Sequence, residues 1–223
     1  MIVFDHVSKH YAHQVALSDI SFVVDQGEMV FLTGHSGAGK STVIRLTMGL
    51  EAISRGQIVV SGQNVGRLRS GKQAQLRQSI GVILQDPCLL DRYNVFDNVA
   101  LPLLIQGMSG FEIKKRVAAA LGKVDLRDIA HQMPAELSAG EQQRVGIARA
   151  IINKPSIILA DEPTGNLDPH LSQEIFALFA AFQEVGATVM VATHDLSLIA
   201  SMPERIITLK SGAILHQSHE MGT

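Results

Sequence analysis

The segment Gly34-His35-Ser36-Gly37-Ala38-Gly39-Lys40-Ser41 fits the phosphate-binding pattern GxxxxGK[ST] at every position. The apolar run 29–32 precedes it, and a helix-like segment follows over 41–50. This order of strand, glycine loop and helix distinguishes a phosphate site from a glycine-rich turn before an ordinary helix. Glycines let backbone N–H groups surround phosphate oxygens, and the helix directs its positive end at them. The sequence therefore predicts a nucleoside triphosphate site.

The residues of this loop have separate expected roles. Lys40 is expected to bridge the β- and γ-phosphates of ATP, and the Ser41 hydroxyl is expected to bind Mg²⁺. The predicted contacts to the nucleotide from this segment are Gly34, His35, Ser36, Gly37, Ala38, Gly39, Lys40, Ser41 and Thr42.

Composition limits the classes of protein to which the chain can belong. Of its 223 residues, 46% are hydrophobic and 18% charged, which indicates a folded globular protein. The formal net charge of −2 and the absence of a long Lys/Arg block give no support to nucleic-acid binding. The sequence shows no apolar run of membrane-spanning length, and its first residues, which lack a basic region followed by a long apolar region, predict no signal peptide. A single cysteine, Cys88, excludes an internal disulfide and fits a reducing cytosol, so any link to a membrane is expected to come through a partner.

The order of apolar segments predicts an α/β fold. Short β-branched runs at 80–84, 156–159, 188–192 and 205–209 alternate with helix-like periodicity such as 171–185, which favours a mainly parallel sheet covered by helices. The middle of the chain instead reads as helices at 95–105, 110–124 and 141–153. We therefore expect one domain over 1–223, with a nucleotide-binding core formed by 1–85 and 156–223 and an inserted helical lobe at 86–155. The first sixty residues contain several strand signals and are expected to add an antiparallel β layer.

Two carboxylates end the buried run 157–160. Asp161 and Glu162 should point to opposite sides, because successive strand residues do so. Asp161 then suits the shell of Mg²⁺, and Glu162 suits the polarisation of an attacking water. By itself, an acidic pair after a strand is usually a solvated strand end; its position downstream of the phosphate loop favours the catalytic interpretation.

The segment Leu137-Ser138-Ala139-Gly140-Glu141 has two explanations that residue chemistry leaves open. Ser138 is a good helix N-cap, and Glu141 three residues later completes a capping box. Alternatively, Ser138 and the N–H of Gly140, at a helix N-terminus, bind the γ-phosphate of a second nucleotide.

Taken together, the motifs resemble those of the nucleotide-binding subunit of ABC-type ATPases. The phosphate loop, the 137–141 segment, the acidic pair, Asn166-Leu167-Asp168 and Thr193-His194-Asp195 occur in one order across almost the whole chain. The resemblance implies the P-loop NTPase fold and a head-to-tail dimer holding two ATP molecules, each between one subunit's loop and the other subunit's Ser138–Gly140 segment. It also implies that Gln85 senses Mg²⁺ and the attacking water, that Asp168 couples the two sites, and that His194 contacts the γ-phosphate and orients this water. Tyr11 matches the aromatic residue that stacks on adenine.

One departure from the family pattern concerns Ala139, where glycine is usual. A methyl group there is expected to be tolerated if the backbone φ is negative, and to slow turnover if a positive φ is needed.

Further details resemble the subgroup whose ATPase partners a membrane protein in bacterial cell division. They are the His35 of the loop, the 91–100 segment and the 140–150 segment. This implies a peripheral position on the cytoplasmic face of the inner membrane at the division septum, with two copies of the membrane partner. The alternative is a lipoprotein-releasing or related exporter ATPase, which shares the 161–168 motif. The partner is expected to bind a groove after Gln85, with apolar anchors among Leu89, Leu90, Val95, Phe96 and Leu101.

Overall fold

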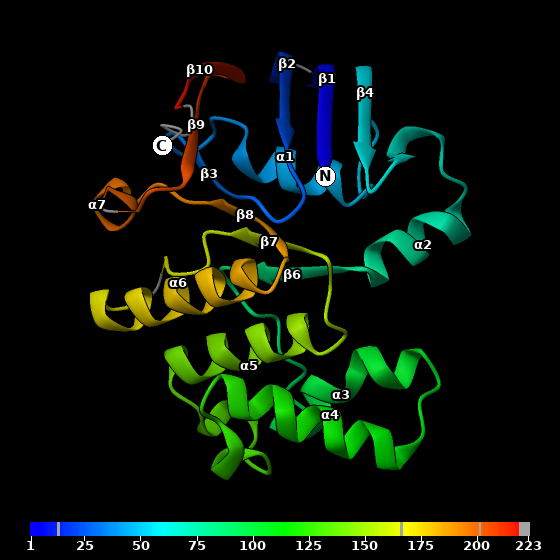
Figure 1. The fold of residues 1–223 in the computed structure, drawn as a ribbon, viewed down its shortest axis with the longest axis vertical. Coiled ribbons are helices and arrows are strands. Elements are labelled where there is room, and N and C mark those ends of the chain that lie inside the picture. The colour runs from blue at the N-terminus through cyan, green and yellow to red at the C-terminus, as the bar shows by residue number, and fades with distance from the viewer. Residues whose placement is uncertain (13, 166, 201, 219–223) are drawn as a thin grey trace.

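A six-stranded sheet forms the centre of the protein, described here from a computed structural model that covers residues 1–12, 14–165, 167–200 and 202–218. Its strand order is β10-β9-β3-β8-β7-β6, as Figure 1 shows in part. The strands are β3 (Met29–Thr33), β6 (Ile80–Leu84), β7 (Ile157–Asp161), β8 (Thr188–Ala192), β9 (Arg205–Lys210) and β10 (Ala213–Gln217). All pairs are parallel except β10 with β9. Every residue of β3 and β8 is buried, as expected for central strands covered on both faces.

A second, four-stranded antiparallel sheet has the order β2-β1-β4-β5. It consists of β1 (Ile2–Tyr11), β2 (Gln14–Val24), β4 (Arg55–Val60) and β5 (Gln63–Asn64). Phe4 and Phe22 stack across β1 and β2 with ring centroids 4.6 Å apart. The predicted antiparallel layer is confirmed.

The helices divide between the two faces of the central sheet. They are α1 (Lys40–Thr47), α2 (Ser70–Gln78), α3 (Val95–Ile105), α4 (Gly110–Lys123), α5 (Ala139–Ile151), α6 (Pro169–Glu184) and α7 (Leu196–Ile199). In Figure 1, α3, α4 and α5 lie together at the end of the molecule opposite β1, β2 and β4. Short 3₁₀ turns occur at Val65–Arg67, Arg127–Ile129 and Pro134–Glu136. No described helix has the length and apolarity needed to cross a bilayer.

Alternation along β3 explains why there are two hydrophobic clusters. Phe31 belongs to the cluster that contains buried residues of α3, α4, α5 and α6, whereas Val30 and Leu32 belong to the cluster that contains buried residues of α1 and the antiparallel sheet. The sheet is therefore covered on both sides, and the carboxyl ends of its parallel strands form one edge. The α/β fold class is confirmed; the division into a core and an inserted lobe at 86–155 stays a prediction.

Candidate functional site

The glycine-rich loop connects β3 to α1 with a backbone that side chains would disturb. Gly34 has φ of 140° and Gly39, the N-cap of α1, has φ of 111°. A Cβ atom at Gly34 would lie 2.3 Å from the carbonyl oxygen of Leu209, and one at Gly39 would lie 2.8 Å from that of Ala16. Both glycines are therefore required by conformation and by close backbone packing.

A cleft of about 640 Å³ lies over this loop. It brings together residues from distant parts of the sequence, including the predicted Tyr11, Gln85, Glu162 and His194. The lining residues are Tyr11, Gln14, Ala16, His35, Ser36, Gly37, Ala38, Gly39, Lys40, Ser41, Thr42, Gln85, Glu162 and His194. Gln14 and Ala16 come from β2 and were missed by sequence reasoning, because no local pattern indicates that this strand reaches the loop.

Lys40 extends back along the loop toward the acidic strand end. Its side chain is buried, and its Nζ donates a hydrogen bond to the carbonyl oxygen of Gly34 at 2.7 Å. The same Nζ lies 3.2 Å from Oε1 of Glu162. The ammonium group is thus placed inside the curve of the loop, where a phosphate would meet it.

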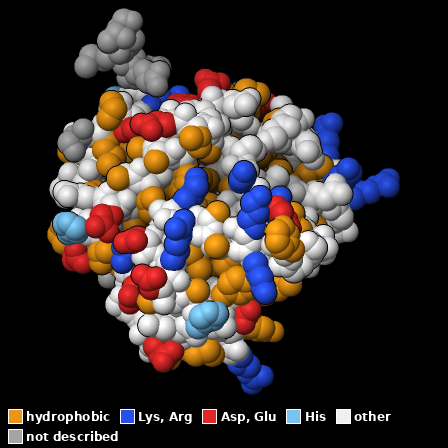
Figure 2. Space-filling view, turned by 60° about the horizontal axis from the view of Figure 1, so that its bottom comes forward, with side chains coloured by type: hydrophobic (Ala, Val, Ile, Leu, Met, Phe, Trp, Pro, Cys, Tyr) orange, Lys and Arg blue, Asp and Glu red, His pale blue; other side chains and the backbone are white. Residues whose placement is uncertain are grey.

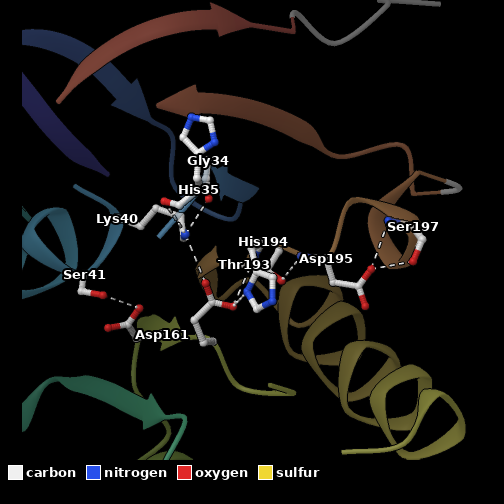
Figure 3. Close-up of polar contacts among 10 residues, drawn as sticks. Gly34, His35, Lys40, Ser41, Asp161, Thr193, His194, Asp195 and Ser197 are labelled. Atoms are coloured by element: carbon white, nitrogen blue, oxygen red, sulfur yellow. Dashed lines mark hydrogen bonds and ion pairs between the residues drawn. The ribbon is translucent and has the colours of Figure 1, made fainter. Parts of the chain in front are cut away.

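Ser41 and Asp161 form the part of the site suited to a metal ion. The Ser41 hydroxyl donates to Oδ1 of Asp161 at 3.0 Å, which joins the first turn of α1 to the end of β7 (Figure 3). Burial raises the pKa of the Asp161 carboxyl, the Ser41 hydrogen bond opposes this rise, and the neighbouring charge of Glu162 adds to it. In the described part of the chain no group of three or more His, Cys, Asp or Glu side chains could hold a metal. Few oxygen ligands from protein are typical of Mg²⁺ that is completed by phosphates and water.

Glu162 and His194 form a hydrogen-bonded pair between the ends of β7 and β8. Nδ1 of His194 lies 2.7 Å from Oε2 of Glu162, and the backbone N–H of His194 donates to the same oxygen at 3.3 Å. Strand β7 ends at Asp161, and Glu162 has φ of 49°. Its direction is therefore set by a left-handed turn and not by strand alternation, which corrects the reason given for expecting two different roles.

Tyr11 and Gln85 both line the cleft. The Tyr11 hydroxyl hydrogen-bonds to a carboxyl oxygen of Glu51, and the ammonium of Lys9 lies 4.6 Å from the centre of its ring. Gln85 follows β6 and lies over Gly165, where an added Cβ would be 2.9 Å from Nε2 of Gln85. Tyr11 thus presents a half-exposed ring, and Gln85 an amide, to the space above the phosphate loop.

Five predicted residues lie outside the described lining of the cleft. Gly34 directly follows β3 and Asp161 ends β7, whereas the other three, Ser138, Gly140 and Asp168, lie at the N-termini of helices. Ser138 is the N-cap of α5 in a capping box with Glu141, whose carboxyl pKa is lowered by its hydrogen bonds from Ser138. Asp168 is the N-cap of α6 and accepts from two backbone N–H groups at 3.0 Å. A Cβ at Gly140 would lie 2.7 Å from the side chain of Leu171. Ser138, Gly140 and Asp168 therefore each have a structural role within their own subunit. Because they do not line this subunit's cleft, any contact that they make with a nucleotide must be at the site of another copy of the chain.

The position at which the sequence departs from the family pattern lies at the start of a helix. Ala139 is the first residue of α5 and is not among the described residues with positive φ, so its methyl group needs no strained backbone. Asn166 lies outside the described residues.

Comparison with known proteins shows the family to which the chain is similar. The family model described as ABC transporter matches residues 17–165. The chain is 54% identical to the cell division ATP-binding protein FtsE of Escherichia coli strain K12, over 95% of this chain and 96% of that protein. It is 45% identical to FtsE of Mycobacterium tuberculosis, over 96% and 94%. The solved dimer of an ATP-binding cassette in a post-hydrolysis state, bound to ADP and Pi, superposes with a TM-score of 0.92 at 33% identity, with both chains fully covered.

Proposed function

The chain belongs to the ABC transporter family and is an ATPase of that family, and on this premise we propose that it supplies the ATP-driven motion of a bacterial cell-division complex. The observation that carries the proposal is the meeting of Lys40, the Ser41–Asp161 pair and the Glu162–His194 pair over one cleft. These are the groups needed to bind phosphates, to hold a divalent ion and to direct a water molecule.

ATP is proposed to bind with its phosphates on the loop. Backbone N–H groups between Gly34 and Gly39 and the positive end of α1 would hold the phosphate oxygens, and Lys40 would contact the β- and γ-phosphates. The ring of Tyr11 would stack on adenine, because it lines the same cleft and is half exposed.

Ser41, Asp161 and Gln85 are the residues proposed to hold Mg²⁺. Their hydroxyl, carboxylate and amide oxygens are ligands that this hard cation prefers, and the hydrogen bond between Ser41 and Asp161 places two of them together. When bound, Mg²⁺ neutralises charge on the phosphate oxygens as the γ-phosphate is transferred.

Glu162 is proposed as the general base and His194 as the group that orients the attacking water and contacts the γ-phosphate. Oε2 of Glu162 is held by the ring and the backbone N–H of His194, while Oε1 faces Lys40. The carboxylate is thus fixed at both oxygens beside the loop, where it can accept a proton from water.

A dimer is needed to complete the site. Ser138 and Gly140 are proposed to cover the γ-phosphate bound to a second copy, and Asp168 to couple the two sites. The dimeric form of the solved cassettes supports this arrangement. ATP between the subunits would favour the closed dimer, and hydrolysis would remove that preference.

The partner is proposed to be the integral membrane protein FtsX, in two copies, with the complex at the cytoplasmic face of the inner membrane at the division septum. Closure of the ATPase dimer would be transmitted through FtsX to control cell-wall hydrolysis. The similarity to FtsE over nearly the full length of both chains supports this assignment over a LolD-like lipoprotein-releasing or MacB-like role, and over any nucleic-acid partner.

The groove that would receive FtsX lies between α2, β6, α3 and the C-terminal end of α5, where Arg149 is among its lining residues and a hollow of about 440 Å³ is found. Leu101, Pro102 and Ile105 of α3 line it, and Ile105 is 72% exposed. Val95 is fully buried in the protein's own core, and Leu89 and Phe96 pack against that core. Of the anchors expected from the sequence, Leu101 therefore fits this groove, whereas Val95 does not.

Two measurements test the proposal. Mg²⁺-dependent ATP hydrolysis should be present in the natural chain and lost in Glu162→Gln; equal rates in the two proteins would contradict the catalytic assignment. The tagged Glu162→Gln chain, incubated with ATP and membranes of its host, should co-purify FtsX. Adding Ile105→Asp should remove FtsX, whereas Leu215→Asp, which changes a similarly exposed leucine on β10, should not. Co-purification of lipoprotein-releasing membrane subunits would replace the cell-division role.

A further inference from the structure

One face of α5 holds the short segment that carries Gln85. Residues Gln143, Gly146 and Arg149 are spaced three apart on α5 and therefore lie on one side of the helix. Nε2 of Gln143 donates to the carbonyl oxygen of Leu84 at 3.0 Å. The guanidinium of Arg149 donates to the carbonyl oxygens of Pro87 and Cys88, the latter at 3.1 Å. The backbone is thus bound on both sides of Gln85.

The same contacts show a close fit between α5 and the segment 84–88. A Cβ at Gly146 would lie 2.8 Å from Cβ of Pro87, so the helix can approach only because this position is glycine. Cys88 has φ of 47°, and its N–H donates to Oδ1 of Asp86 at 2.8 Å, which makes the segment turn sharply. Gln143 is buried, so its amide has few alternatives to the Leu84 carbonyl.

We propose that Gln143 and Arg149 are positioning residues that fix the backbone of 84–88 and thereby set the place of the Gln85 side chain over the phosphate loop. Neither residue lines the cleft among the residues described, so both act through Gln85. This inference rests on the proposed function of Gln85 in ATP hydrolysis.

Helix α5 also connects the Ser138–Gly140 segment to the residues that hold Gln85. Helix α5 begins at Ala139, directly after Ser138, and Gln143 is one turn further along. When Ser138–Gly140 contacts an ATP molecule bound to the phosphate loop of a second copy, the contact therefore acts on the same helix that holds the backbone around Gln85. Helix α5 would thus connect the ATP molecule bound to the second copy with Gln85, on the Mg²⁺ side of the subunit's own ATP site.

The simpler explanation is that Arg149 only stabilises the fold. A double-mutant cycle with Gln85 distinguishes this structural role from the proposed positioning of Gln85. Arg149→Met removes both hydrogen bonds while keeping most of the aliphatic stem, and Gln85→Ala removes the side chain through which it should act. We expect Arg149→Met alone to lower kcat by about 10- to 100-fold, the range produced by a small misplacement of a catalytic group, with little change in the affinity for a fluorescent ATP analogue. In the Gln85→Ala background it should lower kcat no further. Arg149→Lys, which can still reach one carbonyl, should recover part of the loss.

The matched control is Arg116→Met on α4, which removes an arginine that is paired with Glu112 at 2.8 Å and lies outside α5. It should leave kcat unchanged. An equal further loss of kcat when Arg149→Met is added to Gln85→Ala, or full activity of Arg149→Met, would overturn the inference.

Hydrogen exchange provides a readout that does not depend on turnover. Arg149→Met should speed amide exchange in a peptide covering 84–94, while peptides from α1 and β3 stay as protected as in the natural chain. Unchanged exchange over 84–94 would overturn the inference even if the natural chain hydrolysed no ATP. Failure of the proposed function would appear differently, as equal ATPase rates in the natural chain and Glu162→Gln.

Discussion

Replacing Gly34 and Gly37 by alanine should separate two reasons for glycine in one loop. Gly34 has φ of 140°, and its added Cβ would lie 2.3 Å from a backbone oxygen of β9. Gly37 has φ of 79°, and no atom lies within 4 Å of its added Cβ. Both substitutions carry a backbone penalty, but only the first also forces β3 and β9 apart.

The loss of stability expected for each alanine variant follows from its φ angle and from the distances of its added Cβ. An L-residue held in a sparsely populated conformation costs about 1–3 kcal/mol. Overpacking at Gly34 adds about 1–3 kcal/mol, since the opposing atom belongs to a backbone that cannot rotate away. Because each 1 kcal/mol shifts Tm by about 2–4 °C in a chain of this size, the additional overpacking cost should make Gly34→Ala melt about 2–12 °C below Gly37→Ala.

The assays are thermal unfolding by circular dichroism and binding of a fluorescent ATP analogue. Gly37 lines the cleft, so its added methyl group should weaken ATP binding while leaving most of the stability intact. Gly34→Ala should show the opposite balance, with the larger change in Tm. If Gly34→Ala melted at or above Gly37→Ala, the argument from close backbone packing at β9 would be wrong.

Three further predictions concern other parts of the site. Tyr11→Phe should keep ATP affinity within about twofold, because the ring that stacks is retained, whereas Tyr11→Leu should weaken it by about 3- to 10-fold in the same titration. Ser41→Ala should reduce ATP affinity in Mg²⁺ buffer but not in EDTA, and equal losses in both would argue against a metal ligand at this position. Ser138→Ala should lower stability by about 1 kcal/mol at pH 7 through loss of the N-cap. The lowered pKa of Glu141 stabilises the fold above the unfolded pKa and ceases to do so as pH falls through the folded pKa, so this deficit should shrink in melts at acidic pH.

The parts of the fold carried by continuous apolar runs could be predicted from the sequence. Strands 80–84 and 188–192 and helix 95–105 have the expected bounds, because a buried strand or an N-cap such as Asn94 leaves a local signal. Helix α2 and strand β10 were not predicted. Helix α2 is mostly polar with one buried residue, Leu76, and β10 is a half-exposed edge strand.

In the site, too, only the features with a local sequence signal could be predicted. Lys40, Ser41, Glu162 and His194 could be placed together because each stands at the end of a recognisable element. The left-handed backbone of Glu162 could not be predicted, because glutamate has no preference for that conformation and the turn is imposed by pairing with Ala192. The contacts of Gln143 and Arg149 were equally invisible, since their partners are backbone carbonyls about sixty positions away.

The left-handed backbone of Glu162 affects how ATP turnover could be lost during the evolution of this protein. A left-handed residue other than glycine carries a penalty of about 1–2 kcal/mol, and Glu162→Gly would remove it together with the carboxylate. On the proposed assignment, one substitution would yield a descendant that still folds and still holds ATP but cannot complete a cycle. Loss of turnover is therefore one substitution away in this architecture, and relief of the left-handed backbone would offset part of the stability lost with the carboxylate's contacts to Lys40 and His194.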